Sequence, residues 1–316
     1  MEIIKYILGR LGRSLISLFL VIVIVFLLMR LMPVDTYFGD RADKMDDLTK
    51  QAVLAKYGLD KPVLVQLWNY LVDLVHLDFG TSITYFAGKS VWTVIAPKIG
   101  PSFRLGILSL AVSLTLGIAL GLLMVRRYGK LADTLGNIYI MIIQALPSMV
   151  ILLFLQYFGT KVLHISMLWK ANSAITYILP VISMSLGGIA SNAMWIRRYM
   201  MDQINSDYVK LARAKGLSEK KIMSKHVLRN AFAPFAQILP SSLIFTISGS
   251  LYVESLYSIP GMGGLLIKAI QAQDNPLVQT MVLFYAVLSV VSLLLGDLAM
   301  MVCDPRITLT KRGGGR

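Results

Sequence analysis

Side chains that could catalyse a reaction or bind a metal are scarce in this chain. It contains one cysteine, Cys303, and three histidines, which excludes an intramolecular disulfide framework and argues against a Cys/His metal site. The string Gly88-Lys89-Ser90 resembles the end of a phosphate-binding loop, but such a loop needs a glycine at a fixed distance before Gly88, and this chain has Ile83 there. We therefore predict that the chain is not an enzyme and has no ATP, cofactor or metal site of its own.

Polar side chains within long apolar runs form a second set of candidates. Such groups are costly in hydrocarbon, so they should face protein or water. The side chains that we predict to line a solute pathway are Gln144, Ser148, Ser183, Asn192, Gln237, Ser241, Thr246 and Glu254. The alternative, which suits most of the serines, is that these groups hold packed helices together.

Asp297 is the one acid deep within an apolar run. Carboxylates at such a depth are functional by default, and a proton relay would need one. Asp297 has no second acid at depth to relay a proton to, however, and it lies close to Asp304 at the end of the run. We therefore predict a structural role, through a hydrogen bond or an ion pair with a neighbouring subunit.

The elements that must position these residues are membrane helices. The chain has 316 residues, of which 56% are hydrophobic and only 15% charged, and its mean hydropathy of +0.68 is far too high for a soluble domain. A bilayer core needs roughly 20 apolar residues in a helix, because lipid cannot satisfy an open backbone. Six stretches qualify: residues 15–32, 105–125, 135–158, 175–196, 232–253 and 277–302. We predict an all-α integral membrane protein with six transmembrane helices, the first a retained anchor.

The net charge of +14 is distributed unevenly along the chain. Most of the excess cations lie in the N-terminus, in residues 126–130 and 197–229, and in the C-terminal tail. The positive-inside rule places these segments and both termini in the cytoplasm, and residues 33–101 outside. The positive charge is then explained by topology, and a nucleic-acid partner is not expected.

The longest of these basic loops has a pattern of its own. Residues 207–230 read as two short helices, the first capped by Asp207 and ended by Gly216, the second capped by Ser218 and able to run on toward Phe232. The segment is either an amphipathic helix on anionic lipid or a docking element for a cytoplasmic protein. The break at a glycine between two capped helices favours docking.

Several stretches resemble, in the same order, the B-type membrane subunit of ABC importers for oligopeptides, dipeptides and nickel. They are YVKLARAKGLSEKKI and HVLRNAFAP in the basic loop, and RLMPVD, YGLDKPVLVQLWNYL, DFGTSI, ESLYSIPGMGGLL and DPRIT elsewhere. In the wider family the loop carries an EAA-x3-G signature. Aligned on Gly216, this chain has Lys210, Leu211 and Ala212, of which only Ala212 matches, but ARAKG followed by LRNA is typical of the peptide-permease branch.

The resemblance implies a fold and a set of partners. The fold would be the MetI-like permease fold of type I ABC importers, with a helical external region after the first span. The chain would pair with a second, homologous permease subunit as a heterodimer. Two ABC ATPases, which bind ATP and magnesium, would dock on the basic loop, and an extracytoplasmic peptide-binding protein would deliver substrate. The coupling contacts would fall on Tyr208, Leu211, Ala212, Lys215, Gly216 and Leu217.

The domain division follows from the spans and this resemblance. Residues 1–32 form the cytoplasmic N-terminus and first helix, and residues 33–101 the external helical region, which either meets the binding protein or shields the outer mouth. Residues 102–305 form a five-helix permease core with the coupling loop 197–231, and residues 306–316 a cytoplasmic tail. The expected location is the bacterial cytoplasmic membrane.

The expected function is the import of peptides driven by ATP, with this chain forming half of the translocation pathway. A permease for nickel or another metal chelate is an alternative within the same family. Two alternatives from other classes are a proton-coupled carrier that uses Asp297 and a polytopic membrane enzyme or scaffold, although the catalytic set for the latter is missing from the sequence.

Overall fold

The computed structural model describes residues 2–31, 37–38, 45–166, 168–170, 173–247 and 250–303. Within them the regular structure is helical, apart from one isolated bridge between Thr81 and Ser90. The elements are α1 (Glu2–Arg30), α2 (Asp47–Lys56), α3 (Val63–Val75), α4 (Val91–Arg126), α5 (Leu131–Ala145), α6 (Ser148–Lys161), a 3₁₀ turn η3 (Ala174–Tyr177), α7 (Ile178–Ile204), α8 (Asp207–Ala214), α9 (Glu219–Lys221), a π-helical turn η4 (Ile222–Val227), α10 (Leu228–Ile247), α11 (Leu251–Leu256), α12 (Met262–Gln271) and α13 (Asn275–Cys303). The predicted all-α fold class is confirmed.

Four of the described helices are long and apolar enough to cross a membrane. They are Gly9–Arg30 within α1, Val91–Arg126, Ile175–Ile204 and Asn275–Ala299 within α13. These helices correspond to the first, second, fourth and sixth predicted spans. The second is longer than its apolar run, because α4 begins at Val91 and continues through Pro97 and Pro101.

The third predicted span, residues 135–158, is not a straight helix. It is divided between α5 and α6, which are bent by 107° relative to each other. Pro147 explains the break, since a proline disfavours the α conformation in the residue before it, and Leu146 has extended backbone angles. If this bent pair counts as one span, the described residues contain up to five candidate crossings.

The fifth predicted span, residues 232–253, falls on two helices. α10 carries most of it and ends at Ile247, and α11 begins at Leu251. Two prolines, Pro234 and Pro240, lie inside α10, and residues 248 and 249 lie outside the described residues. The predicted total of six crossings is therefore not confirmed by the part of the chain that the structure describes.

The two central helices, α4 and α7, cross in close contact. A Cβ atom added to Gly117 would lie 2.6 Å from Asn192 Cβ, and one added to Gly121 would lie 2.9 Å from the Ala193 carbonyl oxygen. The amide of Asn192 donates to the Ser113 carbonyl at 3.2 Å across the same interface. Gly117 and Gly121, one helical turn apart, lack the side chains that would keep the two helices apart.

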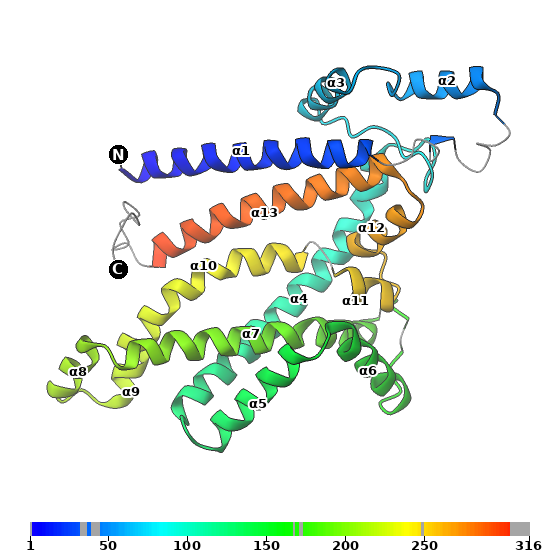
Figure 1. The fold of residues 1–316 in the computed structure, drawn as a ribbon. Coiled ribbons are helices and arrows are strands. Elements are labelled where there is room, and N and C mark those ends of the chain that lie inside the picture. The colour runs from blue at the N-terminus through cyan, green and yellow to red at the C-terminus, as the bar shows by residue number, and fades with distance from the viewer. Residues whose placement is uncertain are drawn as a thin grey trace.

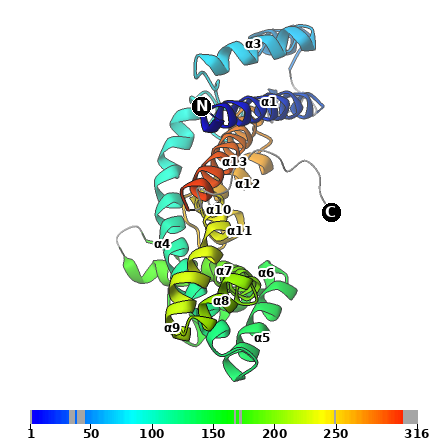
Figure 2. The ribbon, with the colours of Figure 1, turned by 90° about the vertical axis from the view of Figure 1, so that its left-hand side faces the viewer.

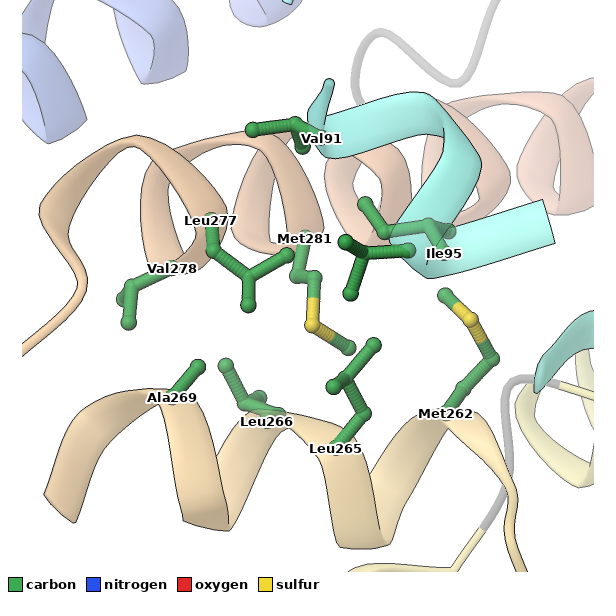
Figure 3. Close-up of a cluster of buried hydrophobic side chains, with 10 residues drawn as sticks. Val91, Ile95, Met262, Leu265, Leu266, Ala269, Leu277, Val278 and Met281 are labelled. Atoms are coloured by element: carbon green, nitrogen blue, oxygen red, sulfur yellow. The ribbon is translucent and has the colours of Figure 1, made fainter. Parts of the chain in front are cut away.

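A buried apolar cluster joins the beginning of α4 to α12 and to the beginning of α13. Figure 3 shows its side chains converging from these three helices. Its members are Val91, Val94, Ile95, Met262, Leu265, Leu266, Ala269, Leu277, Val278 and Met281. This cluster fixes α12, a helix too short to span a bilayer, against two helices that are long enough.

The molecule has two distinct ends (Figure 1). The start of α1, the end of α13 and the turn between α8 and α9 lie on the same side of the molecule, which we call the basic end. The helices α2, α3 and α12 lie at the opposite end, which we call the distal end. The N-terminal helix and the basic loop thus share a side, as the predicted topology requires.

Candidate functional site

The basic loop forms two short helices at the basic end. The N-cap residue of α8 is Ser206, one residue before the predicted cap, Asp207. Asp207 is the first residue of the helix and forms an exposed ion pair with Lys210 at 2.9 Å. Ser218 precedes α9 with extended backbone angles, as expected of a cap residue, but its side chain makes no capping hydrogen bond. Glu219 occupies the first turn of α9. α9 then continues through η4 into α10, which confirms that the second helix runs on past Phe232.

Gly216 ends α8 in the way its position in the sequence predicts. Its φ of +75° lies in the left-handed region, which side chains with a Cβ rarely adopt. The Leu217 amide donates to the Ala212 carbonyl at 3.2 Å, and the Gly216 amide donates to the Arg213 carbonyl at 2.9 Å. These two bonds form a Schellman motif, which satisfies the last carbonyls of the helix.

The two faces of α8 have different surroundings. Val209 and Ala212 are buried against an apolar cluster that includes Ile196 and Met200 of α7 and Phe235 of α10. Leu211, by contrast, is 55% exposed. α8 is therefore held by one face and presents the other.

This geometry divides the six predicted coupling residues. Leu211, Lys215 and Gly216 are exposed, and Leu217 is half-buried. Tyr208 is also half-buried, and its hydroxyl donates to Gln203 Oε1 at 2.8 Å. We predicted that Ala212 contacts the ATPase, but its side chain is buried in the chain's own core. It lies on the same face of α8 as Val209, and this is the face that packs against α7 and α10.

A charge pair braces the turn between the two short helices. Arg213 Nε donates to Glu219 Oε1 at 2.7 Å, and Arg213 Nη2 donates to Glu219 Oε2 at 3.3 Å. The guanidinium hydrogen bonds lower the pKa of the Glu219 carboxyl from its ordinary value. Both side chains are exposed, so the pair contributes little to the stability of the chain.

A cavity of about 740 Å³ lies between the helices that flank the basic loop and their neighbours. Its wall includes residues of α4, α6, α7, α10 and α11. Its polar lining consists of Ser109, Ser113, Ser148, Ser183, Ser191, Asn192, Ser241, Ser242, Ser250 and Tyr252. Among the described residues, no Lys, Arg, Asp or Glu side chain lines this cavity.

The structure brings together four of the predicted pathway residues, Ser148, Ser183, Asn192 and Ser241, which all line this cavity. Ser183 also shares a hydrogen bond of 2.9 Å with the hydroxyl of buried Tyr257. Ser183 and Asn192 therefore each do two things: they line the cavity, and they form a hydrogen bond to another helix or its C-cap.

The other predicted pathway residues lie elsewhere. Gln144 is exposed and its amide approaches Met194 Sδ at 3.5 Å. Gln237 donates to Asp297 Oδ1 at 3.3 Å. The side chain of Thr246 lies outside the described residues.

Glu254 does not line this cavity. Its carboxylate is fully buried and accepts from Ser102 Oγ at 2.6 Å, from the Gly263 amide at 2.7 Å and from the Gly264 amide at 3.2 Å. A Cβ atom on Gly261 would lie 2.4 Å from this carboxylate, so the glycines let the chain wrap around it. We therefore correct its assignment: Glu254 organises the turn before α12.

Asp297 is buried between three helices. It forms an ion pair with Arg10 of α1 and accepts the hydrogen bond from Gln237 of α10. The hydrogen bond agrees with the predicted structural role. The ion pair that the structure describes is made within the chain, whereas we had expected a neighbouring subunit to supply the cation.

Sequence reasoning missed two features of the site. Ser109 and Ser113 line the cavity from α4, and their spacing of one helical turn, continued by Gly117 and Gly121, would have marked this face.

The second missed feature is an ion pair between α5 and α7. Arg197 Nε donates to Asp133 Oδ1 at 2.7 Å, and the Gly129 amide donates to Asp133 Oδ2 at 3.1 Å. The two ionic partners lie far apart in sequence, and only the packing of α5 on α7 reveals them.

Comparison with known proteins identifies the chain's relatives. The sequence profile of binding-protein-dependent transport system inner membrane components matches residues 113–309, and the profile of the N-terminal part of such membrane components matches residues 3–105. The chain is 34% identical over 307 residues to the dipeptide transport system permease protein DppB of Lactococcus lactis, which covers 97% of this chain and 100% of that protein. It is 31% identical over 308 residues to the oligopeptide transport system permease protein OppB of Haemophilus influenzae, covering 96% and 99%.

Two solved structures share the fold. One is the MetNI methionine ABC transporter in inward-facing conformations, with a TM-score of 0.51 and 15% identity over 67% of this chain and 96% of that chain. The other is an amino acid ABC transporter, with a TM-score of 0.52 and 16% identity over 68% and 94%. At these identities the likeness establishes the fold alone.

Proposed function

Because the chain belongs to the family of binding-protein-dependent transport system inner membrane components, we propose that it is the membrane-spanning permease subunit of an ATP-driven ABC importer for peptides. The observation that carries the substrate class is that relatives aligned over nearly the whole chain are dipeptide and oligopeptide permeases. The neutral cavity supports it, because serine and asparagine side chains can hydrogen-bond a peptide backbone whatever the side chains of the peptide are.

The energy source and the partners belong to the same proposal. Two ATPase subunits bind ATP and magnesium and dock on the exposed face of α8. A second, homologous permease subunit supplies the other half of the pathway. An extracytoplasmic binding protein delivers the peptide at the distal end, so the basic end faces the cytoplasm and the complex resides in the bacterial cytoplasmic membrane. The charge distribution supports this orientation.

The fold offers a direct mechanical route from docking to the pathway. The loop that carries α8 connects α7 to α10, and both of these helices contribute to the cavity wall. α8 is fixed to them through buried Val209 and Ala212, and α9 is continuous with α10. A displacement of α8 by the ATPases therefore moves two walls of the cavity.

Reconstitution tests this function. The complete complex, with its second permease and its ATPases, is placed in proteoliposomes with the binding protein on the outside. We expect uptake of a labelled peptide that requires ATP inside the vesicles and persists with an uncoupler. A matched complex with an inactive ATPase subunit should take up none.

Three results would reject parts of the proposal. Uptake that ends with the uncoupler while ATP is present would indicate a proton-coupled carrier. Uptake of a nickel chelate in preference to every peptide tested would change the substrate class. Reaction of the peptide in place of transport would indicate an enzyme.

A further inference from the structure

α3 is an apolar helix that is too short to cross a bilayer. It has 13 residues, and a span needs roughly 20. One side of the helix rests on α1, where the ring of Tyr70 stacks on that of Phe26 with centroids 5.5 Å apart. Gln66, also on this side, donates to the Leu59 and Lys61 carbonyls at 3.3 and 2.6 Å and so fixes the start of the helix.

The other side of α3 carries a row of uncovered apolar side chains. Leu64, Trp68 and Val75 are 79%, 67% and 82% exposed, and Val72 continues the row between Trp68 and Val75. Their spacing in the sequence places all four on one helical face. The polar residues Asn69 and Asp73 follow Trp68 and Val72 directly, so they form a separate, narrow stripe along the helix.

The orientation of α3 relative to α1 is consistent with one covered and one uncovered side. Figure 1 shows α1 along its length and α3 strongly foreshortened, whereas Figure 2 shows α3 along its length above the end of α1. α3 therefore lies across the direction of the first membrane helix, at its distal end. α1, the helix on which α3 packs, also exposes apolar side chains that a bilayer would cover, among them Leu20, Ile24 and Leu28.

From these observations we propose that α3 is an in-plane anchor, which inserts Leu64, Trp68, Val72 and Val75 into the outer leaflet of the phospholipid bilayer. Amphipathic helices of this kind bury their apolar face about 5–10 Å into the boundary between headgroups and acyl chains. Tryptophan is the residue best suited to that depth, because its ring is apolar and its N–H stays within reach of polar partners.

The anchor would have a mechanical consequence for the external region. The loop after α3 is tied to the permease core by buried Asp274, which accepts hydrogen bonds from the hydroxyl of Ser82 and from the Thr84 and Tyr85 amides at 3.3 and 3.0 Å. With α3 in the bilayer, the distal region would be held at two points. The choice of the outer leaflet rests on the orientation in the proposed function, but insertion itself does not.

Tryptophan fluorescence tests the insertion without any transport measurement. The complete complex carries Trp92→Phe, Trp169→Phe and Trp195→Phe in this chain, with the tryptophans of the other subunits replaced in the same way, so that Trp68 is the one reporter left. In nanodiscs, we expect phosphatidylcholine brominated near the headgroup end of its chains to remove most of the Trp68 emission, and bromination near the chain termini to remove little. Aqueous iodide should have little effect.

A matched reporter on the polar stripe provides the control. In the same background, Trp68→Phe with Asn69→Trp moves the indole by one residue, and this reporter should be quenched by iodide and not by brominated lipid. The proposal is overturned if Trp68 responds to iodide like the control. It is also overturned if Trp68 is shielded from iodide and from both lipids, because a protein then covers the face. If the tryptophan variants fail to fold, a spin label at Leu64 tests the same point. Greater access to oxygen than to an aqueous nickel chelate supports insertion, and the reverse overturns it.

Discussion

At the scale of single residues, the local structure at each end of the molecule depends on a few residues whose partners lie within the chain. Gly216 supplies the left-handed turn that ends α8, and Leu211 in the same helix is exposed. Asp297 neutralises Arg10 between α1 and α13, and Glu254 gathers backbone amides before α12. Leu211 is therefore open to contact with a partner, whereas the two buried carboxylates are satisfied within the chain.

The exposed residues of α8 should be required for ATPase docking. Leu211→Asp places a carboxyl group in an apolar contact, which costs at least about 2–7 kcal/mol if water is excluded, the cost of an unpaired polar group. Gly216→Val strains a left-handed residue by about 1–2 kcal/mol and displaces the helix end. We expect both variants to insert but to lose the ATPase in a detergent pull-down, or to hydrolyse ATP without uptake.

Gly216→Asn is the matched control, because asparagine tolerates the left-handed conformation, and it should retain the ATPase. Normal binding and uptake by both Leu211→Asp and Gly216→Val would reduce the loop to a lipid-surface element.

The ion pair of Asp297 should stabilise the chain without carrying protons. Asp297→Asn and Arg10→Gln should each lower the melting temperature of the solubilised complex. The cost should fall below the range of about 3–5 kcal/mol for a broken buried pair, since the Arg10 side chain is 33% exposed. The double variant should lose less than the sum of the single losses. Uptake by Asp297→Asn should remain independent of the proton gradient, and loss of uptake in this variant at unchanged melting temperature would contradict the structural role.

At the scale of elements, proline and glycine decide how the helices meet. Pro147 turns one apolar run into α5 and α6, and the Asp133–Arg197 pair then fixes α5 to α7. Gly117 and Gly121 bring α4 within contact distance of α7, so that hydroxyl and amide groups of both helices border one cavity. The positions of the cavity walls thus depend on a helix break at a proline and on a close helix crossing at two glycines.

The close crossing of α4 and α7 should tolerate no added methyl group. Gly117→Ala would put a Cβ 2.6 Å from Asn192 Cβ and 2.9 Å from the Ile189 carbonyl oxygen, an overpacking that costs about 1–3 kcal/mol. Gly187→Ala on α7 is the matched control, because its Cβ would meet nothing within 4 Å. Thermal unfolding of the solubilised complex should show a lower midpoint for Gly117→Ala only. Equal midpoints would show that the helices can separate freely.

At the scale of the whole molecule, the chain connects a basic end, a neutral cavity and an apolar distal helix. α7 and α10 extend from the loop at the basic end to the cavity wall, and a buried apolar cluster joins α4, α12 and α13. The described lining is uncharged, so this chain's half of the pathway should pass peptides without selecting by charge, and selection would fall to the binding protein.

A charge placed in the cavity should create the missing selectivity. Ser241→Asp should reduce uptake of acidic peptides more than uptake of lysine-containing peptides of equal length, because like charges repel strongly where water is scarce. Ser224→Asp, on the exposed side of η4, should leave the ratio unchanged. If Ser241→Asp lowers both uptakes equally, Ser241 is a packing residue and the cavity is not the pathway.

The orientation of the whole chain should follow its charge. In a Cys303→Ser background, an impermeant thiol reagent added outside cells should label Lys50→Cys and spare Lys220→Cys. The reverse pattern would invert the topology and move the basic end to the outside.

The sequence by itself determined the features that depend on neighbouring residues. Long apolar runs required membrane helices, the family motifs in the loop and elsewhere predicted the permease fold, and Gly216 and Ser218 predicted the break between α8 and α9. These features could be predicted because hydropathy, helix capping and left-handed turns are properties of a short stretch of chain.

The tertiary structure decided what depends on contacts between distant residues. It paired Asp297 with Arg10, turned Ala212 inward, enclosed Glu254 in amides from another turn, and brought Ser113 and Asn192 to one interface. Periodicity shows that a helix has a buried face, but the neighbour that buries it is chosen by the packing of the whole chain. For that reason the sequence marked the polar residues of the spans without separating those that line the cavity from those that hold the helices together.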